Sequence, residues 1–267
     1  VYASGMQGMD IPTKRLVGGG AGPETKKTLE NIDEILRAGG SGLDRAVSCE
    51  VSLRSLADFK AVNAAYAAFW PKGGYPSRVA VQVASLAGTA SVEIRCLAAG
   101  GQLSPEAVPV PGWPSLHGFP LSMGIAAGDV VYASGMQGMD IPTKRLVGGG
   151  AGPETKKTLE NIDEILRAGG SGLDRAVSCE VSLRSLADFK AVNAAYAAFW
   201  PKGGYPSRVA VQVASLAGTA SVEIRCLAAG GQLSPEAVPV PGWPSLHGFP
   251  LSMGIAAGDV VYASGMQ

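Results

Sequence analysis

Two charged residues stand within alternating segments and are the first candidates for chemistry. Arg78 lies in PSRVAVQV and Glu93 lies in SVEIR, and both segments alternate with the period of a β-strand. An arginine can bind a carboxylate through two parallel charge-assisted hydrogen bonds, and a carboxylate can orient an attacking water molecule. Both residues also have a structural interpretation, because Arg78 suits an interface or cross-strand ion pair and Glu93 suits a salt bridge to Arg95.

Each of these residues occurs twice because the chain is a tandem repeat. Residues 1–130 and 131–260 are identical at every position, and residues 261–267 begin a third copy. The copies of the two charged residues are Arg208 and Glu223. Natural duplications drift apart, so complete identity indicates an engineered fusion or a window cut from a longer repeating array.

The charge balance argues against nucleic acid and against an anionic membrane as partners. The chain contains 22 Lys plus Arg and 22 Asp plus Glu, so its formal net charge is zero. Both of those partners favour a protein with a basic face. No apolar run approaches the ~20 residues that a membrane-spanning helix requires.

The cysteines of each unit give no sign of a metal site. Cys49 and Cys96 have no CxxC spacing and no neighbouring histidine. We interpret both as buried small hydrophobic residues on strand faces. Free thiols are typical of a reducing compartment, so the sequence favours a cytoplasmic protein.

Hydrophobic periodicity predicts an α+β unit with the order β-β-α-β-α-β-β. One helix is expected over 24–40, where Leu29, Ile32 and Leu36 recur at helical spacing, and another over 55–71. Strands of period two are expected at 46–55, 77–86 and 90–100, after a hairpin at 119–137. The two helices can cover one face of a mixed sheet. The other face carries polar and small residues, which favours oligomerisation with clefts between units.

Prolines divide the chain into units. The segment 100–118 contains four of them and reads as a linker or an extended arm. Residues 1–108 then form a partial unit that lacks its first hairpin strand, and residues 109–238 form a complete unit. Residues 239–267 hold only a first hairpin. We expect this tail to complete the unit begun by residues 1–108, within the same chain or by a swap with a neighbour.

The order of several segments resembles the RidA/YjgF family of reactive-intermediate deaminases over almost the whole unit. The matching segments are GDVVYASGMQG, TLENIDEILRAGGSGLDRAVSCEVSL, DFKAVNAAYAAFW, YPSRVAVQVASL and SVEIRCLA. The resemblance implies a chorismate-mutase-like α+β fold, a homotrimer, and sites at the subunit interfaces. Since two units cannot close a ring of three, we expect units from different chains to share a ring.

The resemblance also implies an activity. Family members remove ammonia from enamine and imine intermediates such as 2-aminoacrylate and 2-iminopropanoate, leaving a 2-keto acid. The expected partner is therefore a small carboxylate substrate. No metal and no organic cofactor is expected, because the imine is already electrophilic.

Residue by residue, the resemblance assigns carboxylate binding to Arg78 and Arg208. It assigns orientation of the attacking water to Glu93 and Glu223. The other candidates near the substrate are Ser4, Ser134, Asn63, Asn193, Phe119 and Phe249. A strand-end hydroxyl bonded to the backbone is the alternative for the serines, and a structural hydrogen bond is the alternative for the asparagines.

Departures from the family pattern leave the substrate open. Leu121 stands where the deaminases carry a tyrosine, Met123 replaces a glutamine, and Val79 replaces a polar residue after the arginine. Phe119 is the candidate to cover the pocket in place of the tyrosine. The alternatives are another enamine such as 2-aminomuconate, a carboxylate-binding or interaction module without turnover, and an engineered assembly.

Overall fold

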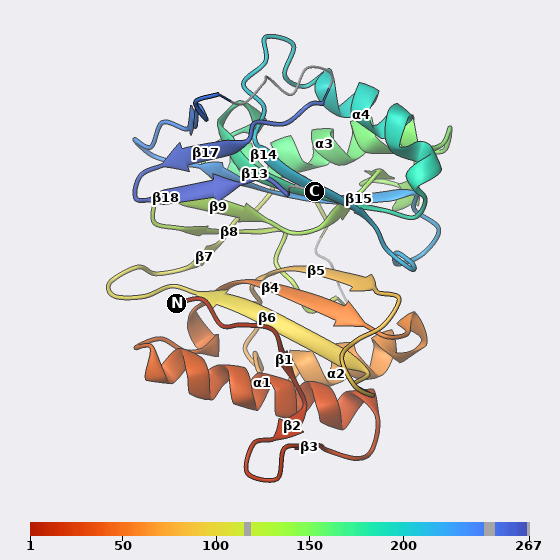
Figure 1. The fold of residues 1–267 in the computed structure, drawn as a ribbon, viewed down its shortest axis with the longest axis vertical. Helices are drawn as coiled ribbons and strands as arrows, with labels where there is room; N and C mark the ends of the chain where they lie inside the picture. The colour runs from red at the N-terminus through yellow and green to blue at the C-terminus, as the bar shows by residue number, and fades with distance from the viewer. Residues whose placement is uncertain (115–118, 243–248, 266–267) are drawn as a thin grey trace.

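A computed structural model of the chain describes residues 1–114, 119–242 and 249–265. Figure 1 shows two layers of β-sheet that face each other, with the helices on the two outer surfaces. Each unit is therefore a sheet with helices on one side only, as the element order predicts.

The first unit is a four-stranded mixed sheet covered by two helices. α1 (Ala21–Ala38) and α2 (Phe59–Ala67) lie on its outer face. The strand order is β1 (Met6–Gln7), β6 (Val92–Ala98), β4 (Ala46–Leu53) and β5 (Ser77–Gln82). A short ribbon of β2 (Met9–Asp10) and β3 (Arg15–Leu16) is separate. β4 runs parallel to β5 and antiparallel to β6.

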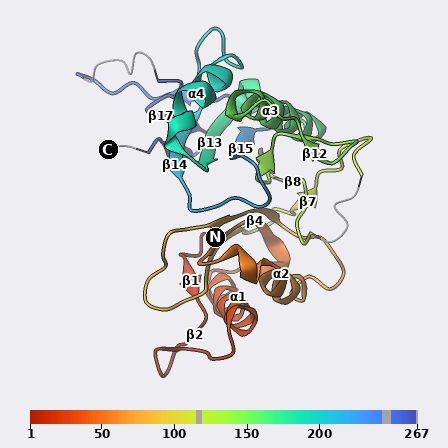
Figure 2. The ribbon, with the colours of Figure 1, turned by 90° about the vertical axis from the view of Figure 1, so that its right-hand side faces the viewer.

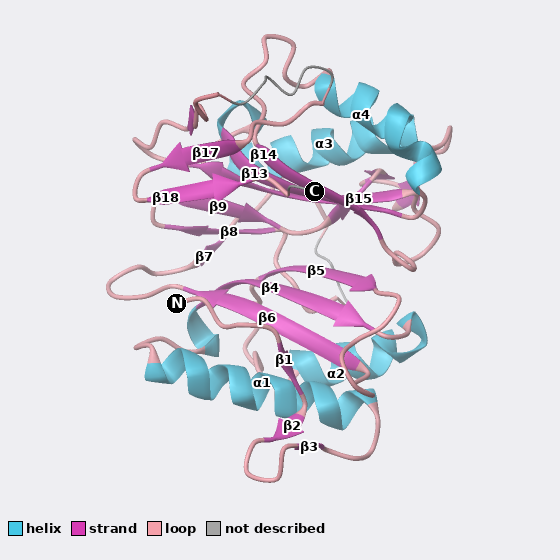
Figure 3. Ribbon diagram, viewed as in Figure 1, coloured by secondary structure: helices cyan, strands magenta, loops and turns pink. Residues whose placement is uncertain are grey.

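The second unit repeats this arrangement and adds a hairpin and an arm. Its helices are α3 (Ala151–Ala168) and α4 (Phe189–Ala197). The main path of its sheet is β14 (Ser207–Gln212), β13 (Ala176–Leu183), β15 (Val222–Ala229), β9 (Val130–Ala133), β8 (Gly124–Ala127) and β7 (Glu106–Ala107). β10 (Met136–Gln137) also pairs with β15, and β11 (Met139–Asp140) pairs with β12 (Arg145–Leu146). Figure 3 shows how the helices of both units stay outside the strands.

The predicted periodicity explains the core. Leu29, Ile32 and Leu36 of α1 are fully buried, and they belong to one core cluster with alternate residues of β4 and β6. α1 ends at Ala38, where Gly39 caps it as expected. No helix in the described ranges is long and apolar enough to cross a membrane.

The hairpin of the second unit covers the inner face of the first. Ile125 and Ala127 of β8 pack with Val47 and Ala99 of the first unit in one apolar cluster. The tail repeats this contact on the second unit, where Ile255 and Ala257 form the corresponding cluster. The hairpin that follows each unit thus packs on part of its inner sheet face, and Figure 2 shows β8 next to β4 of the first unit.

The described residues of the tail hairpin, 249–265, do not pair with the first unit. β17 (Gly254–Ala257) pairs with β18 (Val260–Ala263) and with β16 (Glu236–Ala237). The edge of β6 is instead taken by the opening residues, since Ala3 N donates to the Cys96 carbonyl at 3.0 Å. Completion of the first unit by a neighbouring chain stays a prediction.

The interpretation of the cysteines as free thiols is wrong. Cys49 is bonded to Cys96, and Cys179 is bonded to Cys226. The register places Cys49 of β4 directly opposite Cys96 of β6, on the same face of the sheet. Periodicity along one strand cannot show which residue of another strand lies opposite. The expectation of a cytoplasmic location rested on free thiols and loses that support.

Candidate functional site

The backbone of Arg78 joins the two units. Arg78 lies on β5 of the first unit and is only 3% exposed. Its N–H donates to Ser134 Oγ at 2.8 Å, and its carbonyl accepts from Gly135 N at 3.0 Å. Both partners belong to the loop after β9 of the second unit. The candidate site therefore lies at the junction between units.

The guanidinium of Arg78 is held by one hydrogen bond and two aromatic rings, and it keeps one buried donor without a partner among the described residues. Its Nη1 donates to Asn63 Oδ1 at 2.8 Å, and its Cζ lies 5.0 Å from the ring centre of Tyr66 and 5.8 Å from that of Phe59. Burial lowers the pKa of Arg78. Its Nε is buried and has no hydrogen-bond partner among the described residues. An anion is the natural partner for this remaining edge of the fork.

Glu223 faces this arginine from the second unit. It lies on β15 and is 6% exposed, and its Oε2 accepts from Gln137 Nε2 at 2.9 Å. Burial raises the pKa of Glu223 to about 7, and the Gln137 hydrogen bond and the charge of Arg78 oppose that rise. A carboxylate poised near neutrality can both accept and return a proton.

The hydroxyl of Ser134 links two backbone segments by hydrogen bonds. This hydroxyl is fully buried, accepts from Arg78 N, and donates to the Ser122 carbonyl at 2.5 Å. The only hydroxyl hydrogen is therefore already engaged. This geometry matches the structural alternative for the serine.

Phe119 lies at the mouth of the junction. Its side chain is 49% exposed, and its ring centre is 6.5 Å from that of Phe59. Phe59 was not predicted as a site residue, although it precedes Asn63 by one helical turn and shares its face of α2. Two partners of Glu223, Gln137 and Gly135, were also missed because their contacts depend on strand register.

The second arginine has only part of these surroundings. Arg208 N donates to Ser264 Oγ at 2.9 Å, and Arg208 Nη1 donates to Asn193 at 2.8 Å. Burial lowers the pKa of Arg208, and no carboxylate of the described chain contributes to the shift. Phe249 is 51% exposed. This junction therefore has the arginine without the glutamate.

Glu93, the copy of Glu223 in the first unit, has no arginine partner among the described residues. Gln7 Nε2 donates to Glu93 Oε2 at 2.9 Å, as its copy does in the second unit. Within the described residues no arginine or lysine forms an ion pair with Glu93. Ser4, which precedes this pair, is exposed. Of the predicted residues, the chain brings together Arg78, Asn63, Ser134, Phe119 and Glu223, and leaves the others in two partial sets.

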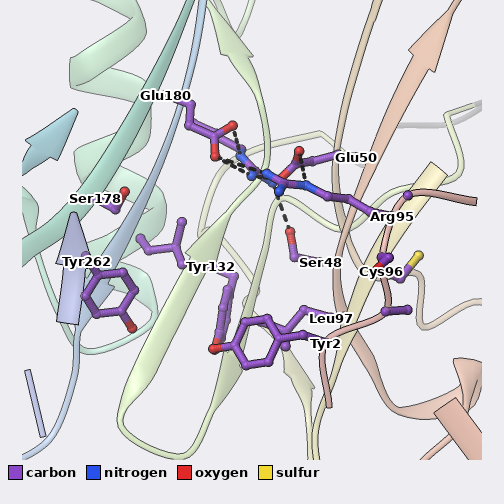
Figure 4. A pocket seen from close by; sticks show the side chains of 15 residues that line it. Tyr2, Ser48, Glu50, Arg95, Cys96, Leu97, Tyr132, Ser178, Glu180 and Tyr262 are labelled. Atoms are coloured by element: carbon purple, nitrogen blue, oxygen red, sulfur yellow. Dashed lines mark hydrogen bonds and ion pairs between the residues drawn. The ribbon is translucent and has the colours of Figure 1, made fainter. Parts of the chain in front are cut away.

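A separate cavity lies where three copies of one tyrosine meet. It has a volume of about 510 Å³, and Tyr2, Tyr132 and Tyr262 line it (Figure 4). Arg225 forms ion pairs there with Glu50 and with Glu180, the latter at 2.7 Å. The first unit, the second unit and the tail hairpin are thus arranged around one common cavity.

These features can be compared with known proteins. A sequence model of the family described as Endoribonuclease L-PSP matches residues 1–100 and 117–230. The chain belongs to this family. The two matched regions show that it contains two RidA/YjgF units in tandem, which confirms the resemblance seen in the sequence.

Individual RidA/YjgF relatives correspond to one unit each. RutC family protein UK114 of Drosophila melanogaster is 39% identical over 119 residues, which are 45% of this chain and 86% of that protein. The human 2-iminobutanoate/2-iminopropanoate deaminase is 36% identical over 115 residues, which are 43% of this chain and 83% of that protein. The crystal structure of the YjgF gene product from E. coli aligns with a TM-score of 0.44 and 26% identity, covering 46% of this chain and 98% of that chain.

Proposed function

We propose that the chain deaminates small enamine or imine carboxylates by hydrolysis, releasing a 2-keto acid and ammonia. The observation that carries the proposal is the junction of Arg78 with Glu223. A buried arginine keeps a donor without a partner among the described residues, and a buried glutamate of the other unit, whose pKa is about 7, interacts with its charge. The names of the deaminase relatives support the same reaction class.

The mechanism follows from these two groups. Arg78 binds the substrate carboxylate through its free edge, which fixes the C=N carbon in place. Glu223 takes a proton from water as the water oxygen bonds to that carbon. Glu223 passes this proton to the nitrogen, which leaves a tetrahedral carbon bearing a hydroxyl and an amine. A second proton then moves from the hydroxyl to the amine through Glu223, and ammonia leaves as the C–N bond breaks and the keto group forms. The imine is electrophilic by itself, so the described residues are sufficient for each step.

The substrate side chain is expected to meet an aromatic wall. Phe59 comes from the first unit and Phe119 from the second, and their rings lie 6.5 Å apart beside Arg78. Since Leu121 replaces the tyrosine of the deaminases, Phe119 is the residue proposed to cover the substrate. Small aliphatic imino acids such as 2-iminopropanoate and 2-iminobutanoate suit this wall.

A second candidate function applies to the junction of the second unit with the tail. Arg208 has the same kinds of asparagine and serine partner as Arg78, but no glutamate among the described residues acts on its pKa. Such a site would bind a carboxylate without turnover. We propose that this junction is a binding site unless a neighbouring chain supplies the missing glutamate.

We also propose that a neighbouring chain completes a ring of three units. The arrangement of Tyr2, Tyr132 and Tyr262 around one cavity supports three positions around an axis. The third position would bring a glutamate to Arg208 and an arginine to Glu93. The resulting homo-oligomer would have sites at its unit interfaces.

The decisive experiment generates the imine in situ and measures keto acid and ammonia. An amino-acid oxidase acting on alanine supplies 2-iminopropanoate, and semicarbazide intercepts the imine that is not hydrolysed. In the monomeric chain Glu223→Gln is expected to abolish the acceleration, while binding of a keto acid is retained because Arg78 is intact. Absence of acceleration by the unsubstituted chain, with carboxylate binding intact, would instead favour the binding module.

A further inference from the structure

Gln137 occupies a fixed position beside the proposed base. It lies directly opposite Glu223 in the antiparallel pair of β10 and β15, where side chains of opposing residues share one face. Its Nε2 donates to Glu223 Oε2 at 2.9 Å and to the Ala217 carbonyl at 3.1 Å. Both amide hydrogens are therefore engaged.

The amide of Gln137 cannot exchange its nitrogen and oxygen. A half-turn would place the amide oxygen against the Ala217 carbonyl and the Glu223 carboxylate, which are both acceptors. The strand behind it is also held, because Asn161 of α3 donates to the carbonyls of Gln137 at 3.3 Å and of Met139 at 2.8 Å. Asn161 is fully buried, so this brace is protected from water.

The other oxygen of Glu223 lies beside Gly135, at the junction of the two units. A Cβ on Gly135 would lie 2.5 Å from Glu223 Oε1, so a residue with a side chain would collide with this oxygen. Gly135 N in turn donates to the Arg78 carbonyl at 3.0 Å. Oε1 is thus next to the segment that joins the units, and no hydrogen bond from the described residues reaches it.

We infer that Gln137 is a positioning residue, which holds Oε2 of Glu223 and leaves Oε1 as the proton acceptor. The inference rests on the proposed function and names the oxygen that acts in it. Water gives one proton to Oε1 while its oxygen bonds to the C=N carbon, and Oε1 gives that proton to the nitrogen. Oε1 then relays the proton of the new hydroxyl to the amine, which leaves as ammonia. The Gln137 donor also favours the ionised carboxylate, which opposes the effect of burial.

The test replaces Gln137 by methionine, which keeps the length of the side chain and removes the donor. The rate rises with pH as Glu223 ionises, and this rise is expected to move to higher pH by about half to one unit, the effect of one lost hydrogen bond. The KM should change little, because Arg78 still binds the carboxylate. The rate at high pH should stay within a few-fold of the original. Equal loss at every pH, with the rise unmoved, would overturn the inference.

Two further measurements separate this inference from the proposed function. The ¹³C chemical shift of the Glu223 carboxyl, assigned with Glu223→Gln, reports its ionisation without any turnover. Its midpoint should rise in Gln137→Met, and an unchanged midpoint would overturn the inference even in an active enzyme. Gln7→Met is the matched control: Gln7 makes the same contact to Glu93, so this variant should leave the Glu223 midpoint unmoved.

Discussion

The two units have identical sequences and different neighbours, so each pair of copies isolates the effect of surroundings. Ile35 on α1 is 37% exposed, whereas its copy Ile165 on α3 is fully buried. The difference comes from the arm and hairpin before the second unit. Gly124 approaches Ile165, and Trp113 donates to Glu164 at 2.8 Å. A helix face that is core in one unit is therefore partly surface in the other.

Copies of the same charged residue also differ in burial, and the difference changes their pKa values. The side chain of Arg225 is 8% exposed between Glu50 and Glu180, while that of its copy Arg95 is 56% exposed. Burial lowers the pKa of Arg225 to about 10. Likewise burial raises the pKa of Glu223 to about 7. The two copies have the same local sequence, so the sequence around each residue does not decide its burial or its pKa. The unit that packs against the residue decides both.

The largest expected difference is in kcat/KM between the alanine variants of the two arginines, Arg78 and Arg208. In the monomeric chain, where the Arg208 junction lacks its glutamate, Arg78→Ala should reduce kcat/KM at least about 30-fold, because a buried charge partner of the substrate is lost. Arg208→Ala should have a much smaller effect, since no glutamate of this chain faces it. Arg78→Lys should rescue little, because an ammonium lacks the planar fork. Equal effects of the two alanine variants, measured by steady-state kinetics, would contradict the functional inequality of the junctions.

Replacing Ile35 or its copy Ile165 by alanine should lower the free energy of unfolding by different amounts. Ile165→Ala removes fully buried atoms, so the free energy of unfolding should fall by about 2–5 kcal/mol. Ile35→Ala should cost clearly less, because this side chain is already partly exposed. Denaturant unfolding followed by circular dichroism measures both. Equal losses would mean that the first helix is also covered in solution, as in a complete ring.

A mixing experiment tests whether chains complete each other. The first double variant, Arg78→Ala with Glu93→Gln, keeps Arg208 as its one proposed carboxylate-binding arginine. The second, Arg78→Ala with Arg208→Ala, keeps Glu93 but has neither of those arginines. Each double variant should be inactive alone. Their mixture should recover a fraction of the activity if Arg208 of one chain meets Glu93 of another. No recovery in a mixture that forms mixed oligomers by sedimentation would rule out this junction.

The smallest expected effect is the pH dependence of stability and activity that comes from Glu223. Glu223 has a pKa of about 7 in the folded chain against an ordinary value of 4.5. The folded state thus binds its proton more tightly, so this group lowers stability as pH rises through that interval. Activity should rise with pH over the same range, as the base form appears. Glu223→Gln should flatten the stability decline, measured by thermal unfolding, whereas Glu93→Gln should leave it in place.

The sequence by itself determined the local elements and the chemistry of the candidate residues. The spacing of Leu29, Ile32 and Leu36 specified a helix with one buried face, and the alternation around Cys49 specified a strand. Both follow from the geometry of the backbone alone. The repeat and the family segments led to the arginine and the glutamate, because they are short motifs on those elements.

Only the tertiary structure decided which copies meet. It paired Cys49 with Cys96 and placed Gln137 opposite Glu223, since both depend on the register between strands. It brought Glu223 near enough to Arg78 for their charges to interact, and no such interaction links Arg208 with Glu93 among the described residues. Identical segments cannot encode this difference, because burial, and with it the pKa of a carboxylate, is set by the unit that packs against them.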